Sequence, residues 1–363
     1  MSNARPLYSH LLDLTDGIGV FEHACYAEPR REHGYCVDDV ARALVVLSRQ
    51  EAIGDVPFAV LTEVGMPVLD LRGTQVRADE LEHAAGVYLR FLARSQAADG
   101  RIVNRCDVLG VFHGEPGVED CWGRALWGLG TAAARSRGAS LAEEALRLFD
   151  RSAVLRSPWT KAMAFAGLGA AEVLRVDSGH AQARALLRDV VAAVGRPGTD
   201  TSWPWPYDRL TYADAVLPDV LMAAGDCLGD DALIEQGLVM LRWLVDLQSA
   251  DEHLSVTPVG GRGRDEERGP GFDQQPIEVA SLADAAVRAL ALTSDPAWSR
   301  VVDRCAAWFF GANDTNVSLY DVATGGCCDG LEAQGRNENQ GAESTLALIS
   351  TLQHASRLAM VRR

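Results

Sequence analysis

The sequence contains no apolar run of the roughly 20 residues that a membrane-spanning helix needs. Its first residues also lack the basic stretch and apolar segment that are typical of a signal peptide. Basic residues number 34 against 50 acidic ones, and the formal net charge of -16 disfavours binding to a polyanion such as nucleic acid. These absences predict a cytoplasmic protein without a membrane or nucleic-acid partner.

The eight cysteines form no C-x-x-C pair, and they show no cysteine–histidine spacing of the zinc-finger kind. Several fall inside apolar, helix-like segments, where a buried reduced thiol is the usual state. Cys327 and Cys328 with His33 are a weak alternative set of metal ligands. No glycine-rich strand-to-helix fingerprint for a nucleotide is found either. The sequence therefore predicts neither a metal site nor a cofactor.

Apolar residues recur with the spacing of amphipathic helices, and alternating strand patterns are scarce. In residues 80–97, for example, Leu81, Ala84, Tyr88 and Leu92 share one face. The same periodicity predicts twelve helices near 5–14, 37–50, 80–97, 121–136, 140–153, 159–175, 180–195, 217–228, 231–249, 276–293, 296–311 and 341–358.

Short connections between these helices alternate with long loops rich in Gly, Pro and Trp. A short turn makes an antiparallel hairpin, so the long loops must all lie at the opposite end of the hairpins and share one rim. The pattern predicts an all-α protein, an (α/α)6 toroid of helix hairpins that forms a single domain over residues 1–363. Residues 51–79 break the alternation, and we expect an insertion on the opposite face.

The first long loop leads into helix 37–50 with His33, Asp38 and Asp39. The field at a helix start stabilises a carboxylate, which suits a catalytic or substrate-binding acid on the rim. The ordinary structural interpretation is an N-cap, with Asp38 paired to Arg42 at i+4.

The second long loop ends in Asp120, which is followed on the next helix by Trp122 and Arg124. An acid beside an indole surface can have its pKa raised by desolvation, as a general acid requires near neutral pH. The alternative is simple helix capping by Glu119 or Asp120.

The third and fourth long loops differ in character. Trp159 and Lys161 in the third fit an ordinary helix start. The fourth is a proline-stiffened aromatic segment whose candidate substrate-binding residues are Trp203, Trp205, Tyr207, Asp208 and Arg209. Aromatic faces stack on sugar rings, and prolines reduce the entropy lost on binding. The alternative is that these aromatics plug the mouth of the barrel as core residues.

The fifth and sixth long loops add further acids and amides. The fifth supplies Asp273 and Gln275 as substrate ligands, and Glu278 in the first turn after Pro276 as a second catalytic candidate. The sixth supplies the polar groups Glu338, Asn339 and Glu343, whose density suits recognition of sugar hydroxyls. Helix caps and first-turn anions explain the same residues without a ligand.

This layout resembles the six-hairpin glycosidase-like superfamily, which implies a carbohydrate cleft at the inner-helix N-termini. Residues 120–129, DCWGRALWGL, resemble the D-x-W-x-R-G-x-G-W segment of unsaturated glucuronyl hydrolases, although Ala125 stands where that segment has glycine. The resemblance implies that Asp120 is the acid/base catalyst and that Arg124 lies near the substrate.

Four other segments resemble an uncharacterised bacterial group found beside or fused to glycosyltransferase modules. They are HGYCVDDVARAL at 33–44, WPWPYDRLTYADAVLP at 203–218, FDQQPIEVASLADA at 272–285 and NENQGAESTLAL at 337–348. This resemblance implies a glycosyltransferase as a partner.

The leading hypothesis is a glycoside hydrolase with Asp120 as the acid and Asp39 or Glu278 as the second carboxylate. A sugar epimerase or isomerase with His33 and His113 as proton carriers is the alternative enzyme. A non-catalytic module that binds glycan for a partner glycosyltransferase is the third possibility. All three predict an oligosaccharide or glycan as the ligand.

Overall fold

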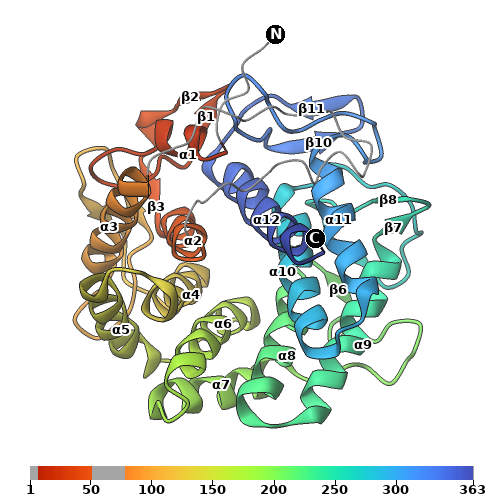
Figure 1. Ribbon diagram of the computed structural model, residues 1–363, viewed down its shortest axis with the longest axis horizontal. Coiled ribbons are helices and arrows are strands. Elements are labelled where there is room, and N and C mark those ends of the chain that lie inside the picture. Colours follow the sequence, from red (N-terminus) through yellow and green to blue (C-terminus); the bar gives the residue numbers. More distant parts are fainter. Residues whose placement is uncertain (1–6, 51–77, 363) are drawn as a thin grey trace.

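The computed structural model describes residues 7–50 and 78–362, and twelve α-helices cover most of this part of the chain. The helices form a ring of two layers, as the periodicity predicts (Figure 1). The inner layer consists of α2 (Val37–Ser48), α4 (Asp120–Arg135), α6 (Thr160–Val176), α8 (Val216–Leu228), α10 (Pro276–Thr293) and α12 (Ala342–Val361). The outer layer contains α3 (Ala78–Ser95), α5 (Ala139–Ala153), α7 (Ala181–Val194), α9 (Asp231–Leu247) and α11 (Pro296–Phe309).

Each inner helix contacts its two inner neighbours, and the contact of α12 with α2 closes the ring. The short helix α1 (Ser9–Asp13) packs against α12. It occupies only part of the predicted helix 5–14, whose first two residues lie outside the described chain. The structure thus confirms the all-α (α/α)6 ring.

The inner helices approach closely where glycine removes the side chain. A Cβ atom added to Gly169 of α6 would lie 2.1 Å from the Leu126 carbonyl oxygen of α4, and one added to Gly130 would lie 2.2 Å from the Gly169 oxygen. The two backbones are therefore in direct contact, which any larger residue would prevent. This packing fixes the relative position of α4 and α6, which both begin at the rim.

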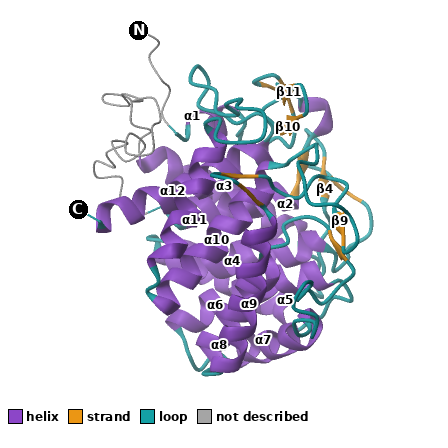
Figure 2. Cartoon of the chain, turned by 90° about the vertical axis from the view of Figure 1, so that its right-hand side faces the viewer, coloured by secondary structure: helices purple, strands orange, loops and turns teal. Residues whose placement is uncertain are grey.

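The long loops gather at one end of the ring, while short turns and the C-terminus lie at the other (Figure 2). The strands are two or three residues long and lie in these long loops: β1 (Ala24–Cys25), β2 (Glu28–Pro29), β3 (Tyr35–Cys36), β4 (Arg105–Cys106), β5 (Phe112–His113), β6 (Arg209–Leu210), β7 (Ser249–Ala250), β8 (His253–Leu254), β9 (Arg262–Gly263), β10 (Gly330–Glu332) and β11 (Gly335–Asn337). Pairing of β3 with β4 and of β6 with β9 ties together loops that are distant in sequence.

The expected insertion at 51–79 falls mostly outside the described residues, and residues 78–79 belong to α3. Within residues 7–50 and 78–362, no helix is both long enough and apolar enough to span a bilayer.

Candidate active site

The rim contains a cavity of about 510 Å³ around the N-terminal ends of α2, α4 and α12, which we call the polar cavity. Its lining residues are mostly charged or polar: Glu22, His23, Cys36, Asp38, Asp39, Arg42, Asp120, Arg124, Gln275, Asp329, Asn337, Gly341, Glu343 and Ser344. Six are acidic and two are arginines. The first turns of three inner helices thus direct carboxylates toward one space, as expected from their position on a shared rim.

Two arginines connect the acids of the polar cavity across helices. Arg42 pairs with Asp39 on its own helix and, with 2.5 Å between Nη2 and Oε2, with Glu343 of α12. Arg124 of α4 lies with its Nε 3.2 Å from Oδ1 of Asp38, and its guanidinium sits 4.1 Å from the centre of the Phe165 ring. The Asp38–Arg42 pair suggested by i+4 spacing is therefore replaced by pairs of Asp39 with Arg42 and of Asp38 with Arg124, because Asp38 faces the neighbouring helix.

The protonation of Asp39 is set chiefly by burial, since only 3% of the residue is exposed. Burial raises the pKa of Asp39 to about 7, with Arg42 opposing the rise and Glu343 and Glu22 adding to it. Near neutral pH this carboxyl group therefore exists in both protonation states. A group of this kind is suited to transfer a proton.

Asp120 joins the polar cavity to a second one of about 610 Å³ between the N-terminal end of α6 and the loop before α8. We call this second space the aromatic cavity, because Trp159, Tyr207 and Tyr212 are exposed in it. The Tyr212 hydroxyl donates a hydrogen bond to Oδ2 of Asp120. Burial and this bond raise the pKa of Tyr212, so its hydroxyl stays protonated and available to donate.

A buried group of charges supports the loop that carries Tyr212. Lys161, the chain's one lysine, donates from Nζ to the Tyr212 carbonyl oxygen at 2.6 Å and to Oδ1 of Asp214 at 2.8 Å. Oε1 of Glu278 accepts the Ala213 N–H at 2.5 Å, and Oδ2 of Asp214 accepts the Thr211 N–H at 2.9 Å. These contacts hold residues 211–214 in the conformation that brings Tyr212 to Asp120.

We predict that Glu278→Gln reduces the loss of unfolding free energy that the wild-type protein shows as pH rises. Burial and the nearby Asp214 raise the pKa of Glu278 from 4.5 to about 8. The native state thus holds this proton more tightly than the unfolded state, and the resulting stability is complete below pH 4.5 and lost as pH rises through 8. Glutamine stays neutral and keeps an oxygen for the Ala213 N–H.

Urea unfolding at about pH 5 and about pH 9 checks this prediction. The wild-type protein should lose more unfolding free energy between the two conditions than the Glu278→Gln variant does. Equal losses would show that Glu278 does not carry the proton.

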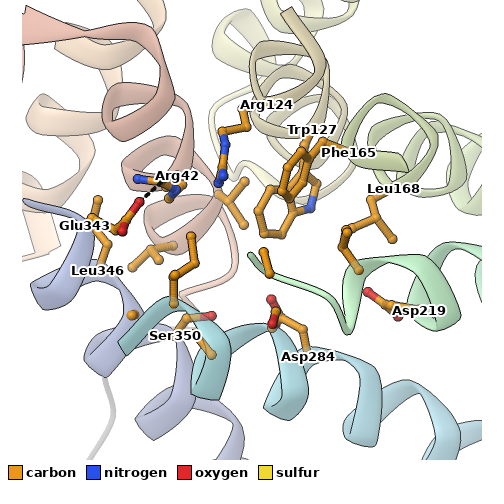
Figure 3. Close-up of a pocket in the computed structure, with 18 residues that line it drawn as sticks. Arg42, Arg124, Trp127, Phe165, Leu168, Asp219, Asp284, Glu343, Leu346 and Ser350 are labelled. Carbon is orange, nitrogen blue, oxygen red and sulfur yellow. Dashed lines mark ion pairs between the residues drawn. The ribbon is translucent and has the colours of Figure 1, made fainter. Parts of the chain in front are cut away.

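Below the polar cavity the centre of the ring narrows to an apolar space of about 50 Å³ (Figure 3). Arg42, Arg124 and Glu343 line both spaces, and Trp127 and Phe165 contribute aromatic surface to the lower one. The centres of these two rings lie 5.8 Å apart in a stacked arrangement. Side chains therefore fill most of the space beneath the polar cavity, and a sugar-sized ligand would enter the cavity from the rim.

The structure brings many of the predicted site residues together. Those that line the polar cavity are Asp38, Asp39, Asp120, Arg124, Gln275 and Glu343. Those that line the aromatic cavity, besides Asp120, are Trp205, Tyr207, Asp208 and Arg209. The remaining candidates, which line neither cavity, are His33, Trp122, Trp203, Asp273, Glu278, Glu338 and Asn339.

Tertiary packing explains why the predicted tryptophans line neither cavity or expose little surface in it. Trp203 and Trp205 are 3% and 2% exposed and pack against Trp243, with ring centres 4.9 and 5.7 Å apart. Trp122 is fully buried, and the Asp120 carboxylate is contacted by the Tyr212 hydroxyl instead.

The other outlying candidates have partners of their own. Glu338 pairs with Arg336 at 3.0 Å, and Oδ1 of Asn339 accepts the Tyr26 N–H at 3.0 Å. Asp273 accepts a hydrogen bond at 2.9 Å from Nε2 of Gln275, which itself lines the polar cavity.

Other residues of the polar cavity come from loops that are remote in sequence: Asp329 belongs to the polar sixth loop, whereas Glu22 and His23 were not predicted. Oδ1 of Asp329 accepts hydrogen bonds from the Ser344 hydroxyl at 2.6 Å and the Gly341 N–H at 2.7 Å. Glu22 and His23 come from the segment before β1, where no periodic pattern marks them. Their polar character is the only sequence signal that they offer.

One group in the polar cavity has the chemistry of a cation site. Ligand atoms of Glu22, Cys36 and Asp39 all lie within 4.8 Å of one another. The two carboxylates already pair with arginines, Glu22 with Arg105 and Asp39 with Arg42. A cation bound there would have to compete with both guanidinium groups.

The histidines are distributed unevenly. His23 lines the polar cavity, and its ring centre lies 5.1 Å from that of His33. His113 is largely exposed and pairs with Asp107 at 2.7 Å, away from the two cavities.

No family model matches the sequence, and no curated protein matches it. Solved structures do match over nearly the whole chain. A sugar epimerase from a ruminal bacterium has a TM-score of 0.68 at 13% identity, with 99% of this chain and 97% of that chain covered. Cellobiose 2-epimerase from Bacillus thermoamylovorans has a TM-score of 0.68 at 10% identity, with coverages of 97% and 95%.

A GH76 α-mannanase from Bacteroides thetaiotaomicron has a TM-score of 0.61 at 12% identity, with 98% of this chain and 95% of that chain covered. Identities this low show the fold alone. The chain therefore shares the all-α (α/α)6 fold of these structures, as its helix pattern predicts.

Proposed function

We propose that this protein is a glycoside hydrolase that uses Asp39 and Asp120 as its two carboxylates. The observation that carries the proposal is that both residues line one cavity from neighbouring inner helices, α2 and α4, in different environments. Asp39 is buried with a pKa near 7, whereas Asp120 is half-buried and held by the Tyr212 hydroxyl. Two carboxyl groups in contrasting environments are what glycosidic bond cleavage requires.

These environments favour Asp39 as the general acid and Asp120 as the base or nucleophile, the reverse of the roles expected from the sequence. Asp39 is protonated in part near neutral pH and can donate a proton to the departing glycosidic oxygen. Asp120 accepts a hydrogen bond through its carboxylate and opens to both cavities, so it can attack the anomeric carbon or activate a water molecule. Glu278 has a structural role in this proposal, because it accepts the Ala213 N–H and holds residues 211–214.

The remaining groups of the polar cavity fit the recognition of sugar hydroxyls. Gln275 and Asn337 offer amides, and Glu343 and Asp329 offer acceptors. Arg124 adds a guanidinium that is 3% exposed and whose Nε forms an ion pair with Asp38 at 3.2 Å without a well-aligned hydrogen bond. A sugar hydroxyl could satisfy such a buried donor.

A sugar epimerase is the second candidate, because the structural neighbours include sugar epimerases. Epimerisation needs proton carriers beside one carbon of an intact sugar. The residues that line the polar cavity include one histidine, His23, and neither His33 nor His113 joins it. This distribution favours hydrolysis by carboxylates.

Proton NMR of oligosaccharides incubated with the protein in deuterated buffer separates the candidates. We expect new reducing ends to form as glycosidic bonds are lost, in gluco-, galacto- or manno-configured substrates. Intact bonds with deuterium appearing beside the anomeric carbon would establish epimerisation instead. Binding without any change in the sugar would indicate a glycan-binding module.

A further inference from the structure

The aromatic cavity exposes tryptophan surface, which is buried elsewhere in the described part of the chain. All eight tryptophans lie in the described part of the chain, and seven of them are 9% exposed or less. Trp159 is 59% exposed, and the neighbouring Tyr207 and Tyr212 are 39% and 40% exposed. Aromatic surface gathered in a concave site usually marks a place where a ligand binds.

Hydrogen bonds hold the two tyrosine hydroxyls and the backbone that carries the tryptophan. Trp159 follows Pro158 and precedes the first residue of α6, and its N–H donates to Oγ of Ser157 at 3.1 Å. The Tyr207 hydroxyl lies 3.0 Å from Oγ1 of Thr160 and donates to the Val194 carbonyl oxygen at 3.2 Å. Tyr212 is fixed at both ends, by Asp120 and by Lys161. Such a preformed surface loses little conformational entropy when a ligand binds.

The aromatic cavity adjoins the proposed reaction centre at Asp120. Asp120 lines both cavities, and its helix α4 stands between α2 and α6 in the ring. A ligand held at Asp120 from the polar cavity therefore has about 610 Å³ of adjoining space on the side of α6 and α8. The polar groups Asp208 and Arg209 border this space and suit hydroxyl groups at the edge of a ring.

We propose that the aromatic cavity is a second sugar subsite, so that the substrate is an oligosaccharide whose rings occupy both sides of Asp120. The ring in this subsite stacks its C–H face on Trp159. The inference rests on the proposed function, because it assumes that the bond to be cleaved lies at Asp120. It makes Trp159 a determinant of chain-length preference and not of the chemical step.

Calorimetric titration of the Asp120→Asn variant with a ladder of oligosaccharides, from one to four rings, tests the subsite without interference from turnover. Adding Trp159→Ala to this variant should weaken the binding of longer oligosaccharides about tenfold or more, the scale of a lost aromatic contact. Affinity for a single sugar should stay the same. Trp159→Phe should restore most of the loss, because it keeps an aromatic face.

Tyr26→Ala is the matched control, since Tyr26 is 66% exposed and lines neither cavity. In the catalytically intact protein, Trp159→Ala should raise KM for oligosaccharides and leave kcat for an aryl glycoside nearly unchanged. Oligosaccharide binding that is insensitive to Trp159→Ala, or an equal loss for single sugars, overturns the subsite alone. Binding of no sugar by any of these proteins overturns the proposed function and the subsite with it.

Discussion

Replacing Asp120 with asparagine is expected to lower kcat by roughly 10²–10⁴-fold while fold and glycan affinity persist. Asparagine keeps the size of the side chain and an oxygen that can accept the Tyr212 hydroxyl bond. It loses the negative charge that a base or nucleophile needs. Because asparagine is tolerated at helix starts about as well as aspartate, α4 should begin as before.

Measuring kcat and Tm on this one variant distinguishes a catalytic role from a structural one. Tyr212→Phe is the companion variant, because it removes the hydrogen bond and leaves the carboxylate in place. Its loss of kcat should be smaller than that of Asp120→Asn. Near-wild-type turnover by Asp120→Asn would remove this residue from the mechanism.

Replacing Asp39 with asparagine is expected to lower kcat on natural oligosaccharides by a similar factor, roughly 10²–10⁴-fold. The amide cannot deliver a proton to the leaving oxygen. Substrates with a nitrophenyl leaving group need little protonation, so the variant should lose far less activity on them. Asp120→Asn should lose activity on both kinds of substrate, which separates the two roles.

The pH profile provides an independent check on Asp39. Its pKa is raised to about 7, so the protonated fraction, and kcat with it, should fall as pH rises through 7 in the wild-type protein. Asp38→Asn is the matched control on the same helical turn, since Asp38 pairs with Arg124 instead. The Asp38→Asn variant should retain the fall in kcat above pH 7. The Asp39→Asn variant should lose this fall. If kcat of Asp39→Asn still falls above pH 7, another group carries the proton.

The helix periodicity and the alternation of short and long connections correctly predicted the ring and the gathering of the long loops on one rim. Both signals are local, because each inner helix buries a stripe of small and apolar residues whatever its neighbours are. The rim follows from connectivity alone, since a hairpin leaves its open ends on one side. Connectivity alone therefore predicts that acids in the first turns, such as Asp39, Asp120 and Glu343, lie near one another.

Which side chains face the cavities depended on the tertiary structure. Glu278 and Glu343 both lie in the first turn of an inner helix, but loop 211–214 covers Glu278 while Glu343 opens to the polar cavity. The conspicuous Trp203 and Trp205 pack against Trp243 of α9, whereas Trp159, which fits an ordinary helix start in the sequence, is 59% exposed. Sequence determines which residues reach the rim, because periodicity and connection length are properties of neighbouring residues. The burial and pairing of each side chain depend on contacts between loops that are distant in sequence. A local sequence pattern carries no information about those contacts.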